Sequence, residues 1–281
     1  MRRIAIALSL ALAGGCAAHT AASGSSSGGA ARVVTLVPSF ADDVYALGAG
    51  AQLVAVSAFT DAPQAKHLPR IADAGSVDAE AILALRPTLV IGIPAQARLT
   101  DPLRRARVRV VLLADDTFAQ IFENLALIGT LTNHVREARA TIGRLRRETA
   151  ALHARTASFR RHPALFLVLG SGPIWTAGAF SYISTLVELA GGTNAASDLH
   201  AAYGEYSAEA LLRRQPDLLV ADPATNLGGV LDREPWRSLR AVREQHLYYV
   251  APDLIERPGP NYNAGLQWLL ERIAPLAERA R

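Results

Sequence analysis

Asp78-Ala-Glu-Ala-Ile-Leu-Ala-Leu-Arg-Pro-Thr-Leu-Val-Ile-Gly92 aligns with Ser207-Ala-Glu-Ala-Leu-Leu-Arg-Arg-Gln-Pro-Asp-Leu-Leu-Val-Ala221, and six positions are identical. In each copy a polar residue starts a short helix, a proline ends it, and an apolar run typical of a buried strand follows. The copies lie too far apart for a solenoid, whose repeats recur every ~20–50 residues. The segment therefore predicts two similar α/β lobes with a cleft between them.

The N-terminal end has the features of an export signal. Arg2 and Arg3 precede an apolar stretch, Ile4–Ala13, which is only ten residues long. A membrane-spanning helix needs ~20 apolar residues, so this stretch indicates a cleaved signal peptide instead. We expect the signal peptide to comprise residues 1–15.

The only cysteine of the 281-residue chain follows this stretch at Cys16. Leu12–Cys16 resembles a bacterial lipobox, which makes Cys16 the expected lipidation site; the alternative is a stray cysteine within a cleaved signal. Residues 16–31 are rich in serine and glycine and are expected to form a flexible tether. These features predict a secreted, lipid-anchored protein in the periplasm or on the outer face of the cytoplasmic membrane.

Composition limits the classes of partner. Half of the chain is hydrophobic and its formal net charge is +4, which suits a well-packed globular protein. No block of five or six like charges is present, so we expect neither nucleic-acid binding nor any membrane contact beyond the lipid anchor.

Strands and helices are expected to alternate in both lobes, as in a mostly parallel sheet covered on both faces. The first lobe is assigned to residues 32–133, with Ser39 as the cap of a helix over Phe40–Leu47. The second lobe is assigned to residues 161–281. Its last helix is expected over Tyr262–Ala280, with a kink at Pro275.

A long helix is expected between the lobes. Val135–Ala157 has no proline and an apolar residue every three or four positions, so it would be roughly 34 Å long. We assign residues 134–160 to this connector. The predicted fold class is thus α/β, with two Rossmann-like lobes joined by one long helix and a ligand cleft between them.

No catalytic signature is found. Gly170-Ser171-Gly172 lacks the spacing of a nucleophile elbow, and no Gly-rich phosphate-binding motif is present. His67 and His200 are isolated, and no histidines pair at metal-binding spacing, so no metal site, cofactor or catalytic residue is predicted.

Candidate binding residues lie in loops that follow strands, because open α/β sheets bind ligands at the carboxyl ends of their strands. Four of these loop residues are aromatic, although aromatic residues make up only 6% of the chain, and they suit a flat or bulky ligand. They are Phe59, Trp175, Tyr203 and Tyr206.

From Arg32 onward, the chain resembles the periplasmic substrate-binding proteins of ABC importers in the class with a rigid helix between two lobes. Within that class it is most similar to the cobalamin-binding proteins. The stretches that carry the resemblance are Thr35-Leu-Val-Pro38, Ser57-Ala-Phe-Thr-Asp61, Pro173-Ile-Trp-Thr-Ala-Gly178, Val187-Glu-Leu-Ala-Gly-Gly192, Asp253-Leu-Ile-Glu-Arg257 and the repeated segment.

The resemblance implies that the chain captures cobalamin or a related corrinoid and delivers it to a permease dimer with its ATPase subunits. It places Phe59, Trp175 and Tyr203 against the corrin ring. The implied polar contacts come from Asp253, Glu256 and Arg257, and Pro38 belongs to the same binding region.

Two departures from the cobalamin binders leave haem and ferric siderophores as alternative ligands. Ala74 replaces a further aromatic residue, and the second-lobe disulfide is absent. Tyr203, Tyr206 or His67 could ligate a haem iron. A cleft enzyme is a remoter alternative, with Glu205, Asp222, Asp253 and Glu256 as its candidate carboxylates.

The resemblance also implies that an acidic residue on each lobe docks on the permease. Glu80 and Glu209 match those positions in the two copies of the repeat. A glutamate in the first turn of a helix is favourable with the helix dipole by ~0.3–1 kcal/mol in any case. The occurrence of both at equivalent places favours the docking role.

Overall fold

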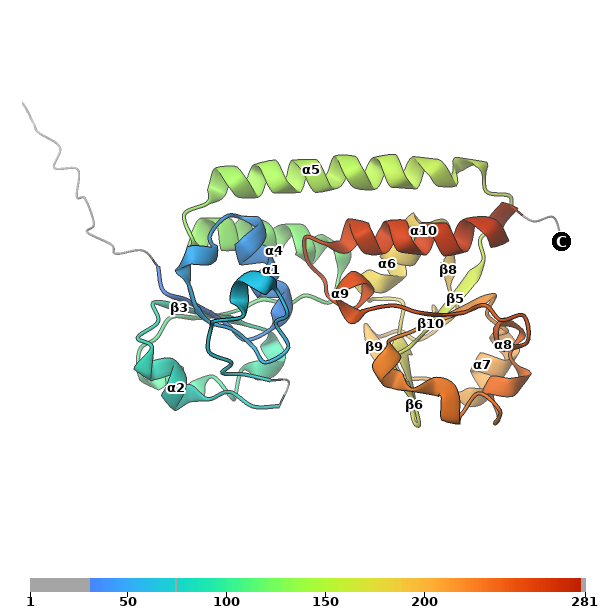
Figure 1. The fold of residues 1–281 in the computed structure, drawn as a ribbon, viewed down its shortest axis with the longest axis horizontal. Coiled ribbons are helices and arrows are strands. Elements are labelled where there is room, and N and C mark those ends of the chain that lie inside the picture. The colour runs from blue at the N-terminus through green and yellow to red at the C-terminus, as the bar shows by residue number, and fades with distance from the viewer. Residues whose placement is uncertain (1–30, 74, 279–281) are drawn as a thin grey trace, which may run out of the picture.

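The computed structural model describes residues 31–73 and 75–278, which form two α/β lobes beneath one long helix (Figure 1). The first lobe holds a parallel four-stranded sheet of order β2-β1-β3-β4. Its strands are β1 (Val33–Thr35), β2 (Leu53–Ala55), β3 (Leu89–Gly92) and β4 (Val110–Leu112). The predictions for residues 1–30, including Cys16, and for Ala74 lie outside the described residues.

Helices cover both faces of the first sheet. They are α1 (Pro38–Ala46), α2 (Ala79–Ala84), α3 (Asp101–Arg105) and α4 (Phe118–Leu131). Val33 packs in one buried cluster with Phe40 of α1 and Leu125 of α4, whereas its neighbour Val34 packs with Ile82 of α2. Both side chains are fully buried, which is why β1 is apolar without alternation.

The second lobe repeats this architecture around a parallel sheet of order β11-β10-β5-β8. Its strands are β5 (Ala164–Val168), β8 (Thr193–Asn194), β10 (Leu218–Ala221) and β11 (Leu247–Tyr249). Its helices are α6 (Tyr182–Leu189), α7 (Ala208–Arg214), α8 (Arg240–Arg243), α9 (Pro252–Ile255) and α10 (Tyr262–Glu278). The predicted fold class is confirmed.

The two copies of the repeat adopt the same local structure. Asp78 Oδ1 accepts a hydrogen bond from the Ala81 amide at 2.9 Å, and Ser207 Oγ accepts one from the Ala210 amide at 3.4 Å. After each helix, the residue just before the proline has a left-handed backbone, Arg86 with φ 48° and Gln215 with φ 46°. The strand then enters the sheet, as predicted.

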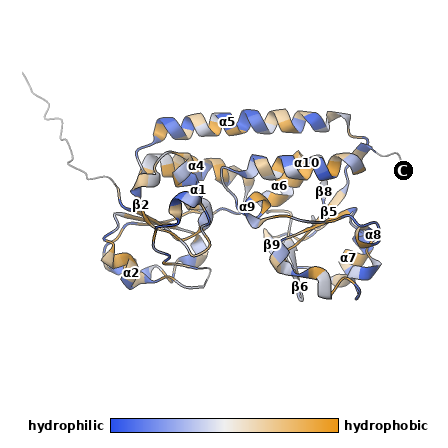
Figure 2. Cartoon of the chain, viewed as in Figure 1, coloured by the Kyte–Doolittle hydropathy of each residue, from blue (hydrophilic) through white to orange (hydrophobic). Residues whose placement is uncertain are grey.

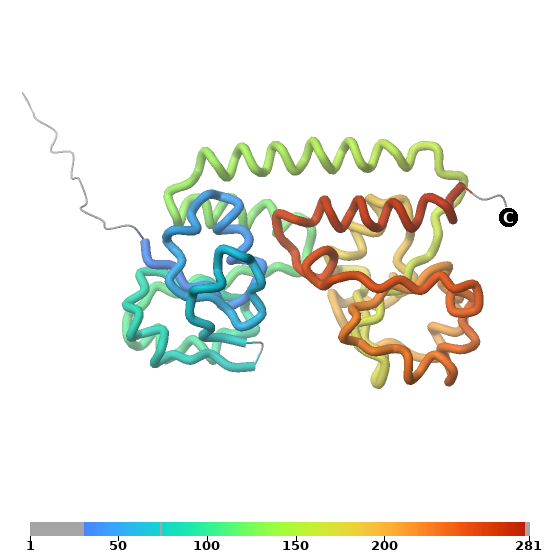
Figure 3. The backbone as a smooth tube through the Cα atoms, in the orientation of Figure 1, coloured from blue at the N-terminus to red at the C-terminus, as the bar shows by residue number. Residues whose placement is uncertain are grey.

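The connecting helix α5 spans Val135–Ala154 without a break and crosses both lobes (Figures 1 and 3). It ends three residues before the predicted boundary, where a 3₁₀ turn over Arg155–Ser158 begins, so it is roughly 30 Å long. Ala138 and Leu145 point inward, while the outer face is hydrophilic (Figure 2).

One hydrophobic core continues from lobe to lobe under α5. It includes Val33 of the first sheet, Leu145 of α5, and Leu167 with Leu269 of the second lobe. Because these buried side chains form a single packed cluster, α5 is held along its length and does not act as a free tether between lobes.

Two local predictions differ from the structure. Ser39 does not cap α1: Pro38 takes the first helical position, and the Ser39 hydroxyl lies 3.5 Å from Asp115 Oδ2 instead. The loops around Trp175 and Tyr203 are strands of a small antiparallel sheet. The predicted last helix is present as α10, with Pro275 inside it, and the kink at Pro275 stays a prediction.

Gly265 positions the start of α10 against α9. A Cβ at this residue would lie 1.9 Å from the Leu254 carbonyl oxygen, so the two helices approach too closely for any side chain. This contact fixes α9, which carries Asp253, to the body of the second lobe.

In the described part of the chain, no helix is both long and apolar enough to cross a bilayer.

Candidate functional site

An ion pair joins the two lobes at the centre of the molecule. Arg257, which follows α9, donates from Nη1 to Asp61 Oδ1 at 2.6 Å and from Nη2 to Asp61 Oδ2 at 3.0 Å. Its Nη2 also donates to the Phe59 carbonyl at 3.2 Å. This bidentate geometry orients both groups, and the hydrogen bond from Arg257 lowers the pKa of Asp61.

The turn that carries Phe59 is held by polar contacts within the first lobe. Ser57 Oγ and Thr60 Oγ1 are 2.9 Å apart, and Arg70 donates to the carbonyl oxygens of both residues. The Phe59 ring is left 62% exposed. A large aromatic ring on a fixed turn is available for a ligand.

Trp175 and Tyr203 lie on the small antiparallel sheet, which consists of β6 (Gly170–Ser171), β7 (Ile174–Ala177) and β9 (Tyr203–Glu205). Ala177 is opposite Tyr203, and Trp175 is opposite Glu205. Residues opposite each other and residues two apart share a face, so Trp175 and Tyr203 are diagonal neighbours on one face. Trp175 is 43% exposed and Tyr203 half-buried.

Tyr203 lies within range of charged groups from both lobes. Burial is the main cause that raises the pKa of its hydroxyl, and the charges of Asp115, Asp116 and Glu256 raise that pKa further. The structure therefore brings Tyr203 near the polar residues predicted to bind ligand. Tyr206 is different: it is 7% exposed, packs against Phe166 and donates to Asp198, so it is not available as a haem ligand.

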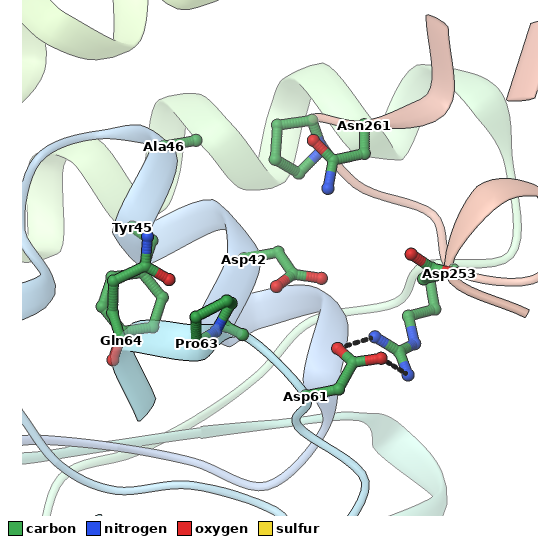
Figure 4. A pocket seen from close by; sticks show the side chains of 11 residues that line it. Asp42, Tyr45, Ala46, Asp61, Pro63, Gln64, Asp253 and Asn261 are labelled. Atoms are coloured by element: carbon green, nitrogen blue, oxygen red, sulfur yellow. Dashed lines mark hydrogen bonds and ion pairs between the residues drawn. The ribbon is translucent and has the colours of Figure 1, made fainter. Parts of the chain in front are cut away.

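A cavity of about 600 Å³ opens beside the ion pair and is lined by both lobes (Figure 4). The first lobe contributes Asp42, Tyr45, Ala46 and Asp61–Gln64; the second contributes Asp253, Arg257, Pro260 and Asn261. Of the predicted ligand-binding residues, only Asp253 and Arg257 line it. Pro38 lies one helical turn before Asp42 in α1. A neighbouring cavity of about 510 Å³ in the first lobe shares Tyr45 and Gln64 with this one, and His67 also lines it.

Four carboxylates at this junction were not among the predicted site residues. They form two doublets, Asp42-Asp43 in α1 and Asp115-Asp116 after β4. Each doublet comes after the carboxyl end of a strand, and that position is the signal that could have revealed them.

Buried carboxylates at the junction have raised pKa values. Burial raises the pKa of Asp42 to about 6, against the opposing charge of Arg257, and raises that of Asp115 to about 6 with help from Asp116. Burial and Asp222 raise the pKa of Glu256 to about 7. Asp43, which is fully buried, has a pKa well above its usual range.

The raised pKa values predict that the protein is more stable at pH 5 than at pH 7.5. These carboxyl groups keep their protons to a higher pH when folded than when unfolded. Their contribution to stability is therefore fully present below about pH 4, where both states are protonated, and it is lost as the pH rises through the folded values of about 6 to 7. We expect a melting temperature several degrees higher at pH 5, since ~1 kcal/mol corresponds to ~2–4 °C at this size.

The variant Asp42→Asn should melt at a higher temperature than the parent at pH 7.5 and show a smaller difference between the two pH values. Equal or lower stability of the parent at pH 5 would contradict the burial of these charges.

Glu80 and Glu209 lie away from this site. Both are exposed, in the first turns of α2 and α7. α2 and α7 are on the side of the two lobes opposite α5 (Figure 1).

No cluster of three or more potential metal ligands occurs among the described residues.

Comparison with known proteins gives consistent matches over most of the chain. The family model described as periplasmic binding protein matches residues 33–254. The vitamin B12-binding protein of Pectobacterium carotovorum subsp. carotovorum is 30% identical over 263 residues, 88% of this chain and 89% of that protein. The ABC transporter substrate-binding lipoprotein YvrC of Bacillus subtilis is 26% identical over 253 residues, 87% of this chain and 80% of that protein.

Among solved structures, the apo form of the periplasmic haem-binding protein RhuT from Roseiflexus sp. RS-1 superposes with a TM-score of 0.80. It is 24% identical, and the match covers 89% of this chain and 100% of that one. At this level of identity the likeness concerns the fold.

Proposed function

The chain belongs to the periplasmic binding protein family as a substrate-binding protein of an ABC importer, and from this we propose that it captures cobalamin or a related corrinoid between its lobes. The family consists of binding proteins, which act together with a permease and its ATPase. The proposal assigns Phe59, Trp175 and Tyr203 to the faces of the corrin ring and the segment from Asp253 to Arg257 to its amide edge.

The arrangement of the aromatic residues is the observation that carries this proposal. Trp175 and Tyr203 share one face of the small sheet, and Phe59 extends from a fixed turn of the other lobe that Arg257 ties to the second lobe. A large, mostly apolar ring with polar amides at its edge fits aromatic faces beside charged hydrogen-bonding groups. The vitamin B12-binding relative supports the same ligand class.

Haem is the second candidate ligand. The charges of Asp115, Asp116 and Glu256, from both lobes, act on the Tyr203 hydroxyl, and a tyrosine oxygen can ligate haem iron. A ferric siderophore is a further alternative on the same scaffold. Because iron ligation would give haem a distinct visible spectrum, absorption spectroscopy can distinguish bound haem from bound cobalamin.

Cobalamin binding is expected to be submicromolar and to depend strongly on Trp175. We expect Trp175→Ala to weaken it at least about tenfold, ~1.4 kcal/mol, because the ring would lose an aromatic face. Titration calorimetry measures the affinity, and saturating ligand should raise the melting temperature of the wild-type protein. Leu127→Ala on α4 is the matched control, since Leu127 is 41% exposed and Trp175 43% exposed.

Binding of haem but not cobalamin, with loss of the haem spectrum in Tyr203→Phe, would transfer the assignment to haem. Equal cobalamin affinities of the Trp175 and Leu127 variants would remove Trp175 from the site.

Delivery and anchoring complete the proposal. Glu80 and Glu209 are assigned to docking on basic residues of the permease, and Cys16 to acylation that holds the protein at a membrane outside the cytoplasm. The lipoprotein relative and the periplasmic family support this location.

A further inference from the structure

Carboxylates from three parts of the chain meet where the lobes meet. α1 contributes Asp42 and Asp43, and the turn after β2 contributes Asp61. The segment between β4 and α4 contributes Asp115 and Asp116. Their charges act on one another: Asp61 and Asp253 raise the pKa of Asp42, while Asp42 and Asp115 raise that of Asp43. We call these five residues, together with Asp222, Asp253 and Glu256 of the second lobe, the junction carboxylates.

The second lobe adds Asp253 from α9, Glu256 directly after it, and Asp222 after β10. The charge of Asp222 acts on Glu256. The cavity of about 600 Å³ has Asp42, Asp61 and Asp253 in its walls. Carboxylates therefore border this space from both lobes, in a chain whose formal net charge is +4.

The Arg257 guanidinium is paired within the junction. Within the described residues, Arg257 and Arg70 are the cations whose charges act on this group. Both Nη atoms of Arg257 are bonded to Asp61, and Arg70 Nη1 is bonded to the carbonyls of Ser57 and Thr60. The cation between the two lobes, Arg257, is thus already neutralised by Asp61, while Arg70 bonds only neutral carbonyl groups.

Asp43, which is next to Asp42 but does not line the cavity, is a buried carboxyl whose hydrogen bonding is incomplete. Its side chain is only 2% exposed, and its Oδ1 has no hydrogen-bond partner. Gly259 of the second lobe lies close by, since a Cβ built on it would be 4.0 Å from this oxygen. Glu256 Oε1 is also buried without a partner. Buried polar atoms are rarely left unsatisfied without a reason.

We propose that the junction carboxylates select ligands by charge: the site takes ring ligands whose edge carries amides and whose centre is neutral or cationic, and it rejects rings with carboxylate edges. This inference rests on the proposed corrinoid function and narrows it. A carboxylate edge would meet like charges in a partly buried site, where repulsion is weakly screened. An amide edge would donate hydrogen bonds to the same oxygens.

A series of corrinoids tests the charge rule. The probes are diaquacobinamide, which is cationic, cyanocobalamin, which is neutral overall, and cobyrinic acid, whose edge carries carboxylates. At pH 7.5 we expect cobyrinic acid to bind at least about a hundredfold more weakly than diaquacobinamide, and the ratio to shrink as salt rises from about 50 to about 500 mM.

The double variant Asp42→Asn with Asp253→Asn should reduce this affinity ratio at least about tenfold. A ratio of affinities is insensitive to a change in the folded fraction, so loss of stability cannot imitate the effect. Asp101→Asn, an exposed acid on α3 that pairs with Arg104, is the control and should leave the ratio unchanged.

The outcomes separate the charge rule from the corrinoid assignment. If all three corrinoids bind equally well, the charge rule is wrong and the corrinoid function stands. If no corrinoid binds, the corrinoid function fails. The charge rule is then tested by comparing the affinity for hemin, which carries two carboxylates, with the affinity for its dimethyl ester. Tighter binding of the ester would uphold it, and tighter binding of the free dicarboxylate would overturn it.

Discussion

Replacing Glu80 and Glu209 together by arginine is expected to abolish ligand uptake by cells while ligand binding by the purified protein persists. Both carboxylates are exposed at equivalent places of the repeat, on the side of the molecule away from α5 (Figure 1). Such paired charges would steer and register docking on a basic permease surface. Exposed ion pairs contribute only ~0–1 kcal/mol each, so the single variants should show much smaller defects.

The matched control reverses two other exposed acids, Glu123 of α4 and Glu271 of α10, one on each lobe. Both helices lie next to α5, so this double variant should import ligand normally. Glu80→Arg and Glu209→Arg also each lose ~0.3–1 kcal/mol of helix-dipole energy. Melting temperatures therefore need to be measured for both variants. Uptake by the Glu80 and Glu209 double variant at the parental rate would leave the two residues as helix-start acids without a docking role.

Cys16→Ser is expected to move the protein from the membrane fraction entirely to the soluble fraction. The thiol of Cys16 is the proposed acylation site, and serine cannot form the thioether link to the lipid. The residues around the junction are unchanged, so ligand affinity should equal that of the wild type. Ser23→Cys in the Cys16→Ser background is a useful control, because a cysteine outside the lipobox should not restore anchoring. Membrane association of the Cys16→Ser variant at the wild-type level would contradict the anchor.

The repeated segment was the part of the fold most accessible from sequence. A capping side chain, a short apolar helix, a proline and a strand-forming run act locally, so each copy predicted its own structure. α2 with β3 and α7 with β10 follow that order. The connector α5 was equally clear, because its buried residues recur at helical spacing from Ala138 to Thr149, about three turns.

The small antiparallel sheet could not be predicted in the same way. β6 has two residues and β9 has three, too few to show an alternating pattern, and β9 pairs with β7 across the intervening helix α6. The helix start at Pro38 was missed for a different reason. Serine is a good cap and proline a good first helical residue, and in Pro38-Ser39 the order of the two decides the outcome.

The aromatic residues and the polar loop of the site could be predicted from the sequence, whereas the buried aspartates could not. Aromatic residues and the Asp253–Arg257 segment are uncommon enough in loops to attract attention. Asp42, Asp43, Asp115 and Asp116 are ordinary acids in sequence, and only the packing of α1 against the segment after β4 shows that they converge. Their burial, which gives them their chemistry, is a property of tertiary structure alone.

The unbroken connecting helix has a consequence for the rate of transport. Because α5 and the shared core hold the lobes in one arrangement, Glu80 and Glu209 should keep the same separation whether or not the protein carries its cargo. Empty and loaded molecules would then occupy the permease with similar ease. Each empty molecule becomes a competitor for the same entrance, so overproducing the protein when its cargo is scarce should slow import.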